Sequence, residues 1–166
     1  MLGMYEIGSL ILYGRTGICR VDSISENADS QIFYTLKPLY QSCSITIPAE
    51  SDKVFTRPII SADEAHRLID IMPSLQAEPY YNRNLNQLRE HYRSCIDSHS
   101  CEELIRLTKS LHLKRTEMES TKRKFGAVDE RFMREAEDLL FGEFAAALGI
   151  ERENVRNYIA DRLAMA

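Results

Sequence analysis

The chain changes character at the stretch Glu78-Pro-Tyr-Tyr-Asn-Arg-Asn-Leu-Asn-Gln-Leu-Arg-Glu-His-Tyr-Arg93. Before it, short runs of β-branched and aromatic residues alternate with polar residues, which is typical of strands. After it, apolar residues recur every three to four positions, which is typical of amphipathic helices. The sequence therefore predicts an α+β fold in which a small all-β unit precedes an all-α unit.

Two adjacent tyrosines, Tyr80 and Tyr81, open this stretch and are followed by Arg83, Arg89 and Arg93. Aromatic rings can stack on or wedge against bases while arginines hold phosphates, so this combination suits a nucleic-acid contact. A tyrosine pair after a proline also commonly packs one unit against the next, and on composition alone packing is the simpler interpretation. Both interpretations stay open at this point.

The composition is that of an ordinary globular protein: 166 residues, of which 44% are hydrophobic and 28% are charged. We expect a cytoplasmic protein that does not enter membranes, because no apolar run is long enough to span a bilayer and no charged segment precedes an apolar one at the start. The cysteines form no C-x-x-C pair, which predicts free thiols and neither a metal site nor a cofactor. They are Cys19, Cys43, Cys95 and Cys101.

The net charge of −4 is unevenly distributed along the chain, with −3 in residues 1–77, +3 in residues 78–125 and −4 in residues 126–166. Only the middle block has the sign that attracts phosphate, and so small a surplus predicts modest, salt-sensitive affinity. Basic residues on helices often serve only solubility, and Glu117 and Glu119 interrupt the cluster. The residues that we expect to contact nucleic acid are Tyr80, Tyr81, Arg83, Arg89, Lys109, Lys114, Arg115, Lys122, Arg123 and Lys124.

Five short strands are expected in the first 60 residues, from apolar runs over 10–13, 18–21, 32–39, 44–47 and 54–58. Gly14-Arg-Thr-Gly17 joins the first two as a tight glycine turn. So many short strands in so short a segment predict a small, bent antiparallel barrel of the SH3-like or Tudor-like kind. We assign residues 1–60 to this unit.

Helix starts are predicted by two capping-box sequences, Ser61-Ala-Asp-Glu64 and Ser100-Cys-Glu-Glu103. The first helix lies in residues 61–79, which we interpret as a connecting helix and linker. Residues 80–166 are interpreted as a compact helical unit of four or five helices. Within it, Gly149 is expected to end a long helix.

Motifs of common enzymes, such as a dinucleotide fingerprint, a P-loop or a nucleophile elbow, are missing from the sequence. Cys95 and His99 have the i, i+4 spacing that would bring a thiol and an imidazole together on a helix. Because no third orienting residue is evident, we assign no catalytic residue, and a thiol hydrolase remains a minor alternative.

Taken in order, several segments resemble the CarD family, which comprises bacterial RNA polymerase-binding regulators related to the polymerase-interacting domain of transcription-repair coupling factors. The resemblance extends over nearly the whole chain and depends on the order of the segments more than on any one of them. The segments are Tyr5-Glu-Ile-Gly-Ser-Leu-Ile-Leu-Tyr-Gly-Arg-Thr-Gly17, Phe33-Tyr-Thr-Leu-Lys37, Ile45-Thr-Ile-Pro-Ala49, Arg57-Pro58, Glu137-Asp-Leu-Leu140 and Leu148-Gly-Ile150.

The resemblance implies a Tudor-like domain that docks on the polymerase β subunit and a helical domain that contacts promoter DNA at the upstream edge of the transcription bubble. The family places a tryptophan near the start of the helical domain; this chain has no tryptophan, and Tyr81 stands at that position. We expect docking by strand addition, in which a strand of the polymerase pairs with an edge strand of this domain. The residues expected to bind polymerase are Ser44, Ile45, Thr46, Ile47 and Pro48.

The leading hypothesis is therefore a non-enzymatic transcription regulator that binds polymerase and modulates the stability of open promoter complexes. Its DNA contact would be weak and largely independent of sequence, and the protein is expected to be a monomer. The alternative is an interaction module of the same family, which binds polymerase or another partner without useful DNA contact.

Overall fold

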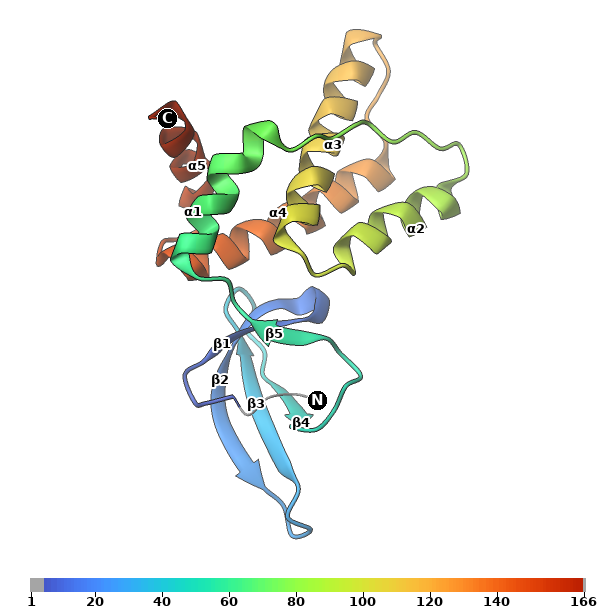
Figure 1. Ribbon diagram of the computed structural model, residues 1–166. Helices are drawn as coiled ribbons and strands as arrows, with labels where there is room; N and C mark the ends of the chain where they lie inside the picture. Colours follow the sequence, from blue (N-terminus) through green and yellow to red (C-terminus); the bar gives the residue numbers. More distant parts are fainter. Residues whose placement is uncertain (1–4, 166) are drawn as a thin grey trace.

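The computed structural model describes residues 5–165 as an antiparallel sheet followed by helices (Figure 1). Residues 1–4 of the expected first unit and residue 166 of the expected last unit lie outside the described residues. The strands are β1 (Leu10–Tyr13), β2 (Gly17–Glu26), β3 (Ile32–Pro38), β4 (Ile45–Pro48) and β5 (Thr56–Pro58). The helices are α1 (Ala62–Ile71), α2 (Leu85–Ile96), α3 (Cys101–Ser120), α4 (Ala127–Leu148) and α5 (Val155–Ala164).

The five strands form a sheet in the order β4-β3-β2-β1-β5, and the sheet is open. The α+β class is as predicted, and each strand overlaps its predicted position, although β2 continues to Glu26, five residues beyond the predicted end. The strands do not close into a barrel. Within residues 5–165, β4 and β5 pair on one side only, and they are four and three residues long. A bulge between Val21 and Ser23 bends β2, beyond which the β2–β3 ribbon projects away from the rest of the protein (Figure 1).

The helix ends follow the predicted local signals. The Ser61 and Ser100 hydroxyls accept hydrogen bonds from the backbone N–H groups of Glu64 and Glu103, which caps α1 and α3. The two glutamate carboxylates bond arginines on the next turn instead of reaching back to the cap. Gly149 ends α4 with a φ of +69°, a left-handed conformation that glycine adopts without steric cost.

Helix α1 belongs to the helical core. Ala65, Leu68 and Ile69 are buried in the same apolar cluster as residues of α2, α3, α4 and α5. Helix α1, expected as part of a connecting segment, thus packs into the helical core. A separate, smaller core lies in the sheet, built from Ile11, Cys19, Val21, Tyr34, Leu36 and Ile47.

Hydrogen bonds and an ion pair connect the sheet unit to α4. The Arg57 guanidinium donates to both carboxylate oxygens of Glu143, over 2.6 and 2.8 Å, and also to the carbonyl of His99. The Glu143 carboxylate accepts a further bond from the Ile60 N–H, and its residue is only 2% exposed. The Tyr40 hydroxyl donates to the Gly142 carbonyl over 2.9 Å. We call the ion pair between Arg57 and Glu143 the junction pair.

Candidate nucleic-acid interface

The two tyrosines at the start of the helical unit lie in different environments. The Tyr80 ring stacks on His91 with the ring centroids 3.7 Å apart and packs edge-on against Tyr92. Tyr80 therefore fits the packing interpretation. The Tyr81 side chain is 43% exposed and fits the contact interpretation.

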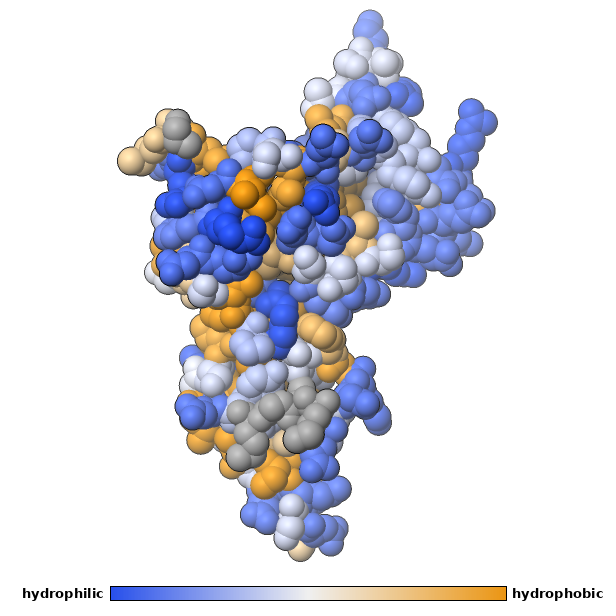
Figure 2. Space-filling model, viewed as in Figure 1, coloured by the Kyte–Doolittle hydropathy of each residue, from blue (hydrophilic) through white to orange (hydrophobic). Residues whose placement is uncertain are grey.

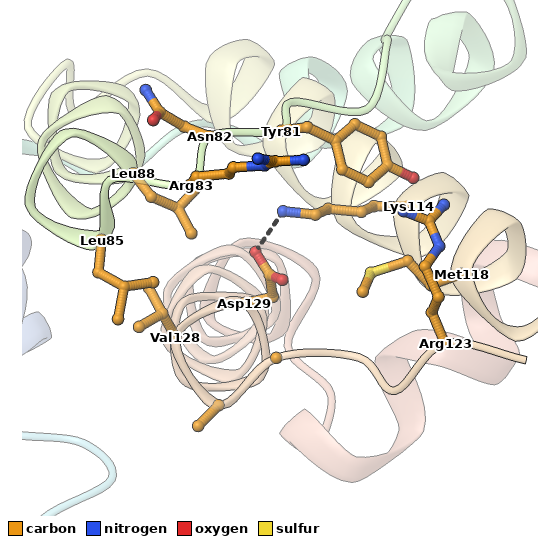
Figure 3. Close-up of a pocket in the computed structure, with 12 residues that line it drawn as sticks. Tyr81, Asn82, Arg83, Leu85, Leu88, Lys114, Met118, Arg123, Val128 and Asp129 are labelled. Atoms are coloured by element: carbon orange, nitrogen blue, oxygen red, sulfur yellow. Dashed lines mark hydrogen bonds and ion pairs between the residues drawn. The ribbon is translucent and has the colours of Figure 1, made fainter.

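Tyr81 lies at a groove of about 660 Å³ between the segment that precedes α2, the second half of α3 and the start of α4 (Figure 3). We call this the Tyr81 groove. Its apolar wall includes Leu85, the first residue of α2, which is 51% exposed. The lining residues are Tyr81, Asn82, Arg83, Leu85, Leu88, Lys114, Met118, Arg123, Gly126, Ala127, Val128 and Asp129.

Three of the ten residues predicted to contact nucleic acid line this groove together with Tyr81 itself: they are Arg83, Lys114 and Arg123. The Lys114 Nζ lies 4.9 Å from the centroid of the Tyr81 ring, and the Arg123 guanidinium carbon lies 5.5 Å from it. At these distances a cation is attracted to the electron-rich face of an aromatic ring. The groove thus combines an accessible ring with cationic groups.

Lys114 is not the exposed phosphate ligand that we expected. It is 4% exposed, and its ammonium donates to Asp129 Oδ1 over 2.8 Å and to the Tyr92 hydroxyl over 3.3 Å. The Tyr92 hydroxyl donates to the same oxygen over 2.6 Å. The sequence held a signal for this burial, since Lys114 follows Leu111 by three residues and precedes Met118 by four, on the apolar stripe of α3. Asp129 and Val128, at the start of α4, also line the groove and were not among the residues predicted from the sequence.

The Lys109 ammonium also forms hydrogen bonds within the protein. Its ammonium donates to the carbonyls of Met72 and Leu75, over 2.7 and 2.6 Å, and so closes the end of the segment that follows α1. These bonds use two of its three donors and give Lys109 a structural role. Lys109 does not line the Tyr81 groove.

The remaining predicted contacts lie on or near the α2 and α3 end of the helical unit, where the surface is largely hydrophilic (Figure 2). Lys122, Arg123 and Lys124 are exposed in the loop after α3, as predicted. The Arg115 guanidinium lies over the Phe125 ring, 4.6 Å from its centroid. Arg89 bonds the side chain of Asn86 along α2, and it does not line the groove.

Burial shifts the titration of the aromatic layer beneath Tyr81. Burial and then the neighbouring charge of Lys114 lower the pKa of His91, so the imidazole that stacks on Tyr80 is neutral at neutral pH. Burial, followed by the hydrogen bond to Asp129, raises the pKa of Tyr92, which therefore keeps its proton as a donor.

The predicted polymerase contact lies at an edge of the sheet. β4 pairs with β3 alone within the described residues, with Ile47 opposite Tyr34. The Ala49 N–H donates to the Ile32 carbonyl, so the alternation of an antiparallel ladder directs the Thr46 N–H and C=O away from β3. Among residues 5–165 no strand pairs with Thr46 on that side, so its backbone groups can pair with another strand.

The side chains of this segment alternate between exposed and more buried positions, as expected for a strand with one face against the core. Ser44, Thr46 and Pro48 are exposed, Ile45 is partly buried, and Ile47 is buried in the sheet core. Ser44 precedes the strand itself. Pro48 carries no N–H, so it limits how far a partner strand can extend along this edge.

The helical thiol–imidazole pair does not form. α2 ends at Ile96, and His99 lies beyond it with a φ of +55° and its ring stacked on Phe55 at 4.3 Å. Burial, and then the charge of Glu103, raise the pKa of Cys95, which opposes formation of a nucleophilic thiolate.

Among residues 5–165, no three His, Cys, Asp or Glu side chains are arranged to hold a metal ion. Over the same residues, no helix has the length and apolar character required to cross a bilayer. No protein-family model matches the chain, and no curated protein matches its sequence at a significant level.

Proposed function

We propose that this chain is a non-enzymatic transcription regulator, similar to the CarD family, which binds the β subunit of RNA polymerase through its sheet and contacts promoter DNA through the Tyr81 groove. The observation that carries the proposal is the exposed Tyr81 ring, flanked by the cations of Arg83, Lys114 and Arg123. Such a regulator would act in the bacterial cytoplasm.

The Tyr81 ring suits an unstacked base step better than an intact duplex. Aromatic side chains fill steps that are already widened, as at the upstream edge of a melted promoter. The exposed guanidiniums of Arg83 and Arg123 can then bind flanking phosphates. Lys122 and Lys124 extend this charge along the loop after α3.

The sheet supplies the tether in this proposal. We propose that it is an open counterpart of a Tudor-like domain and that a strand of the polymerase β subunit pairs with β4 at Thr46. The chain as a whole carries a charge of −4, so its DNA contact is weak by itself. Docking on polymerase raises the local concentration of the groove near the DNA and compensates for this weakness.

The regulatory effect follows from differential affinity. A groove that binds parted strands better than paired ones shifts the promoter equilibrium toward the melted complex. The shift equals the difference in binding free energy between the two states and no more.

The test is the lifetime of competitor-challenged open complexes formed by the cognate polymerase, with and without the protein. Tyr81→Ala should remove most of the effect, because loss of an aromatic contact to a base costs about 1–3 kcal/mol. Leu113→Ala is the matched control, because Leu113 is 45% exposed on α3 and lies outside the groove.

The alternative, an interaction module without DNA contact, is supported by the internal bonds of Lys109 and Lys114, which reduce the cationic charge available to phosphates. If Tyr81→Ala leaves the lifetime unchanged while changes at Thr46 abolish polymerase binding, the alternative holds.

A further inference from the structure

The Tyr81 ring has little backbone support for its orientation. Residues 76–84 form neither helix nor strand, so no ladder of hydrogen bonds fixes the side chains of this segment. Asn82 bonds the Tyr80 hydroxyl and Gln87, which orders the backbone beside Tyr81 without touching its ring. The two cationic contacts from Lys114 and Arg123 are thus the polar interactions that act on the ring itself.

The Lys114 cation is held firmly beneath this ring. Its ammonium is anchored by Asp129 and Tyr92, and Figure 3 shows it extended between Asp129 and Tyr81. An ammonium taken out of water is unfavourable unless it is paired, and an apolar side chain would suit the stripe of α3 equally well. A cation that has lost its hydration shell attracts an aromatic face more strongly than an exposed one does.

We propose that Lys114 is a positioning residue for Tyr81, whose ring it holds in the orientation that meets an unstacked base. This inference rests on the proposed DNA contact and deepens it. Asp129 and Tyr92 fix the ammonium, and the ammonium fixes the ring. Arg123 differs from Lys114 because it is exposed. Its Nε donates to Thr121 Oγ1, and we expect its terminal N–H groups to bind phosphate.

The proposal separates Lys114 from the phosphate ligands through the salt dependence of binding. Each phosphate contact of a protein contributes about 0.9 to the slope of log affinity against log salt on duplex DNA, and about 0.7 on single strands. Arg123→Gln should therefore reduce the slope by nearly one. Loss of the Lys114 charge should weaken binding and leave the slope unchanged.

The experiment uses the full chain with Tyr81→Trp, which introduces a single tryptophan because the chain has none. In this background, Lys114→Gln/Asp129→Asn replaces the ion pair by an amide pair of similar shape, which can keep the hydrogen bonds to Tyr92. Lys114→Arg retains the charge. Circular dichroism checks folding, acrylamide quenching measures freedom of the ring, and a labelled duplex with a mismatched bubble measures DNA binding across a salt series.

The neutral pair should raise the quenching constant about twofold and weaken bubble binding by about twofold to fivefold, as expected from loss of a cation–π contact. Lys114→Arg should restore both values toward those of the parent. A folded neutral pair with the parent's quenching would overturn the proposal, and so would a salt slope reduced by one, which would make Lys114 a phosphate ligand.

Fluorinated tryptophans at the same position provide a test that leaves the core unchanged if the neutral pair does not fold. The test uses an Arg123→Gln background, because Arg123 also contacts the ring and would otherwise contribute to the response. Fluorination weakens the negative face of the ring, so quenching relative to the free amino acid should rise with each added fluorine. Quenching that does not respond to fluorination would overturn the proposal. If quenching responds while the parent fails to bind bubble DNA, the positioning stands and the proposed DNA function falls.

Discussion

Helix α4 carries a buried carboxylate near each end, and the two are used differently. Glu143, near the end of the helix, pairs with Arg57 of β5 and accepts a backbone N–H from Ile60. Asp129, near the start, pairs with Lys114 of α3 and accepts the Tyr92 hydroxyl. Both carboxylates are almost fully buried, at 2% and 4% exposure.

The difference lies in what the cations face. The Arg57 guanidinium donates to Glu143 and to the carbonyls of Pro58 and His99, so its hydrogen bonds are made within the protein, although its side chain is 23% exposed. The Lys114 ammonium is bonded inward and also lies beneath the half-exposed Tyr81 ring. A buried ion pair can therefore join two parts of a protein, as Arg57 and Glu143 do. It can also orient a side chain at the surface, as we propose for Lys114, whose cation lies next to the solvent-exposed ring of Tyr81.

The largest effect is expected at the junction. Glu143→Ala should lower the free energy of unfolding by about 3–5 kcal/mol, because it leaves the Arg57 guanidinium without its carboxylate in a partly buried site. Urea unfolding measures this change. Asp97→Asn is the matched control, since the Arg15–Asp97 pair also joins the two units but has both side chains about half exposed. Loss of the Arg15–Asp97 pair should lower the free energy of unfolding by about 0.5 kcal/mol. Equal decreases for the two variants would contradict the distinction between a buried and an exposed ion pair.

Lys114→Met should cost somewhat less, about 2–4 kcal/mol, because the Asp129 carboxylate keeps the Tyr92 hydroxyl as a donor after the ammonium is lost. Urea unfolding again provides the measurement. Lys114→Met/Asp129→Leu removes both charges and should recover part of the loss. Failure of the double variant to recover any stability would mean that packing, and not an unpaired carboxylate, explains the cost.

A smaller effect is expected at the free edge of the sheet. Thr46→Pro removes the outward N–H, and loss of one backbone hydrogen bond to a partner strand costs about 0.5–1.5 kcal/mol of binding free energy. Binding to a fragment of the polymerase β subunit, measured by calorimetry, should weaken accordingly. Thr46→Val keeps the N–H and should bind more tightly than Thr46→Pro. Equal affinities would exclude strand addition at this residue.

The smallest effect is expected from pH. The pKa of His91 is lowered from its usual value of 6.5, so the unfolded chain takes up a proton at a higher pH than the folded one. Stability should therefore be nearly constant above about pH 7 and fall as pH drops below 6.5, by at most about 1.4 kcal/mol at pH 5.5. His91→Phe keeps a ring against Tyr80 and should flatten this dependence in urea unfolding, apart from the contribution of His99, whose pKa is also lowered.

Local features of the fold were predictable from the sequence because they depend on near neighbours. The alternation of Ile45 and Ile47 indicated a strand with one buried face, and Ser61, Ser100 and Gly149 marked helix ends through hydrogen bonds or φ values within a few residues. The open sheet was not predictable in the same way. Closure depends on pairing between β4 and β5, which follow one another in the sequence but lie at opposite edges of the sheet. Strands of four and three residues are too short to indicate their partners.

The candidate site was predictable only in part. The sequence located an aromatic pair beside a cationic block, and one tyrosine of that pair is accessible with Arg83 and Arg123 nearby. It could not separate Tyr80 from Tyr81, since adjacent residues outside a helix or strand have no period that assigns a face. It also treated Lys109 and Lys114 as surface charges, although their acceptors lie 34 and 15 residues away in the chain.

By itself, the sequence determined the α+β class, the order of the elements and the block that carries positive charge, because periodicity, capping and composition act over short distances. Only the tertiary structure decided which charges are used inside the protein and which face the solvent. A lysine beneath an aromatic ring and a lysine on a surface are the same letter in a sequence. They differ in whether folding brings a carboxylate such as Asp129 within hydrogen-bond reach of the ammonium and removes both from water.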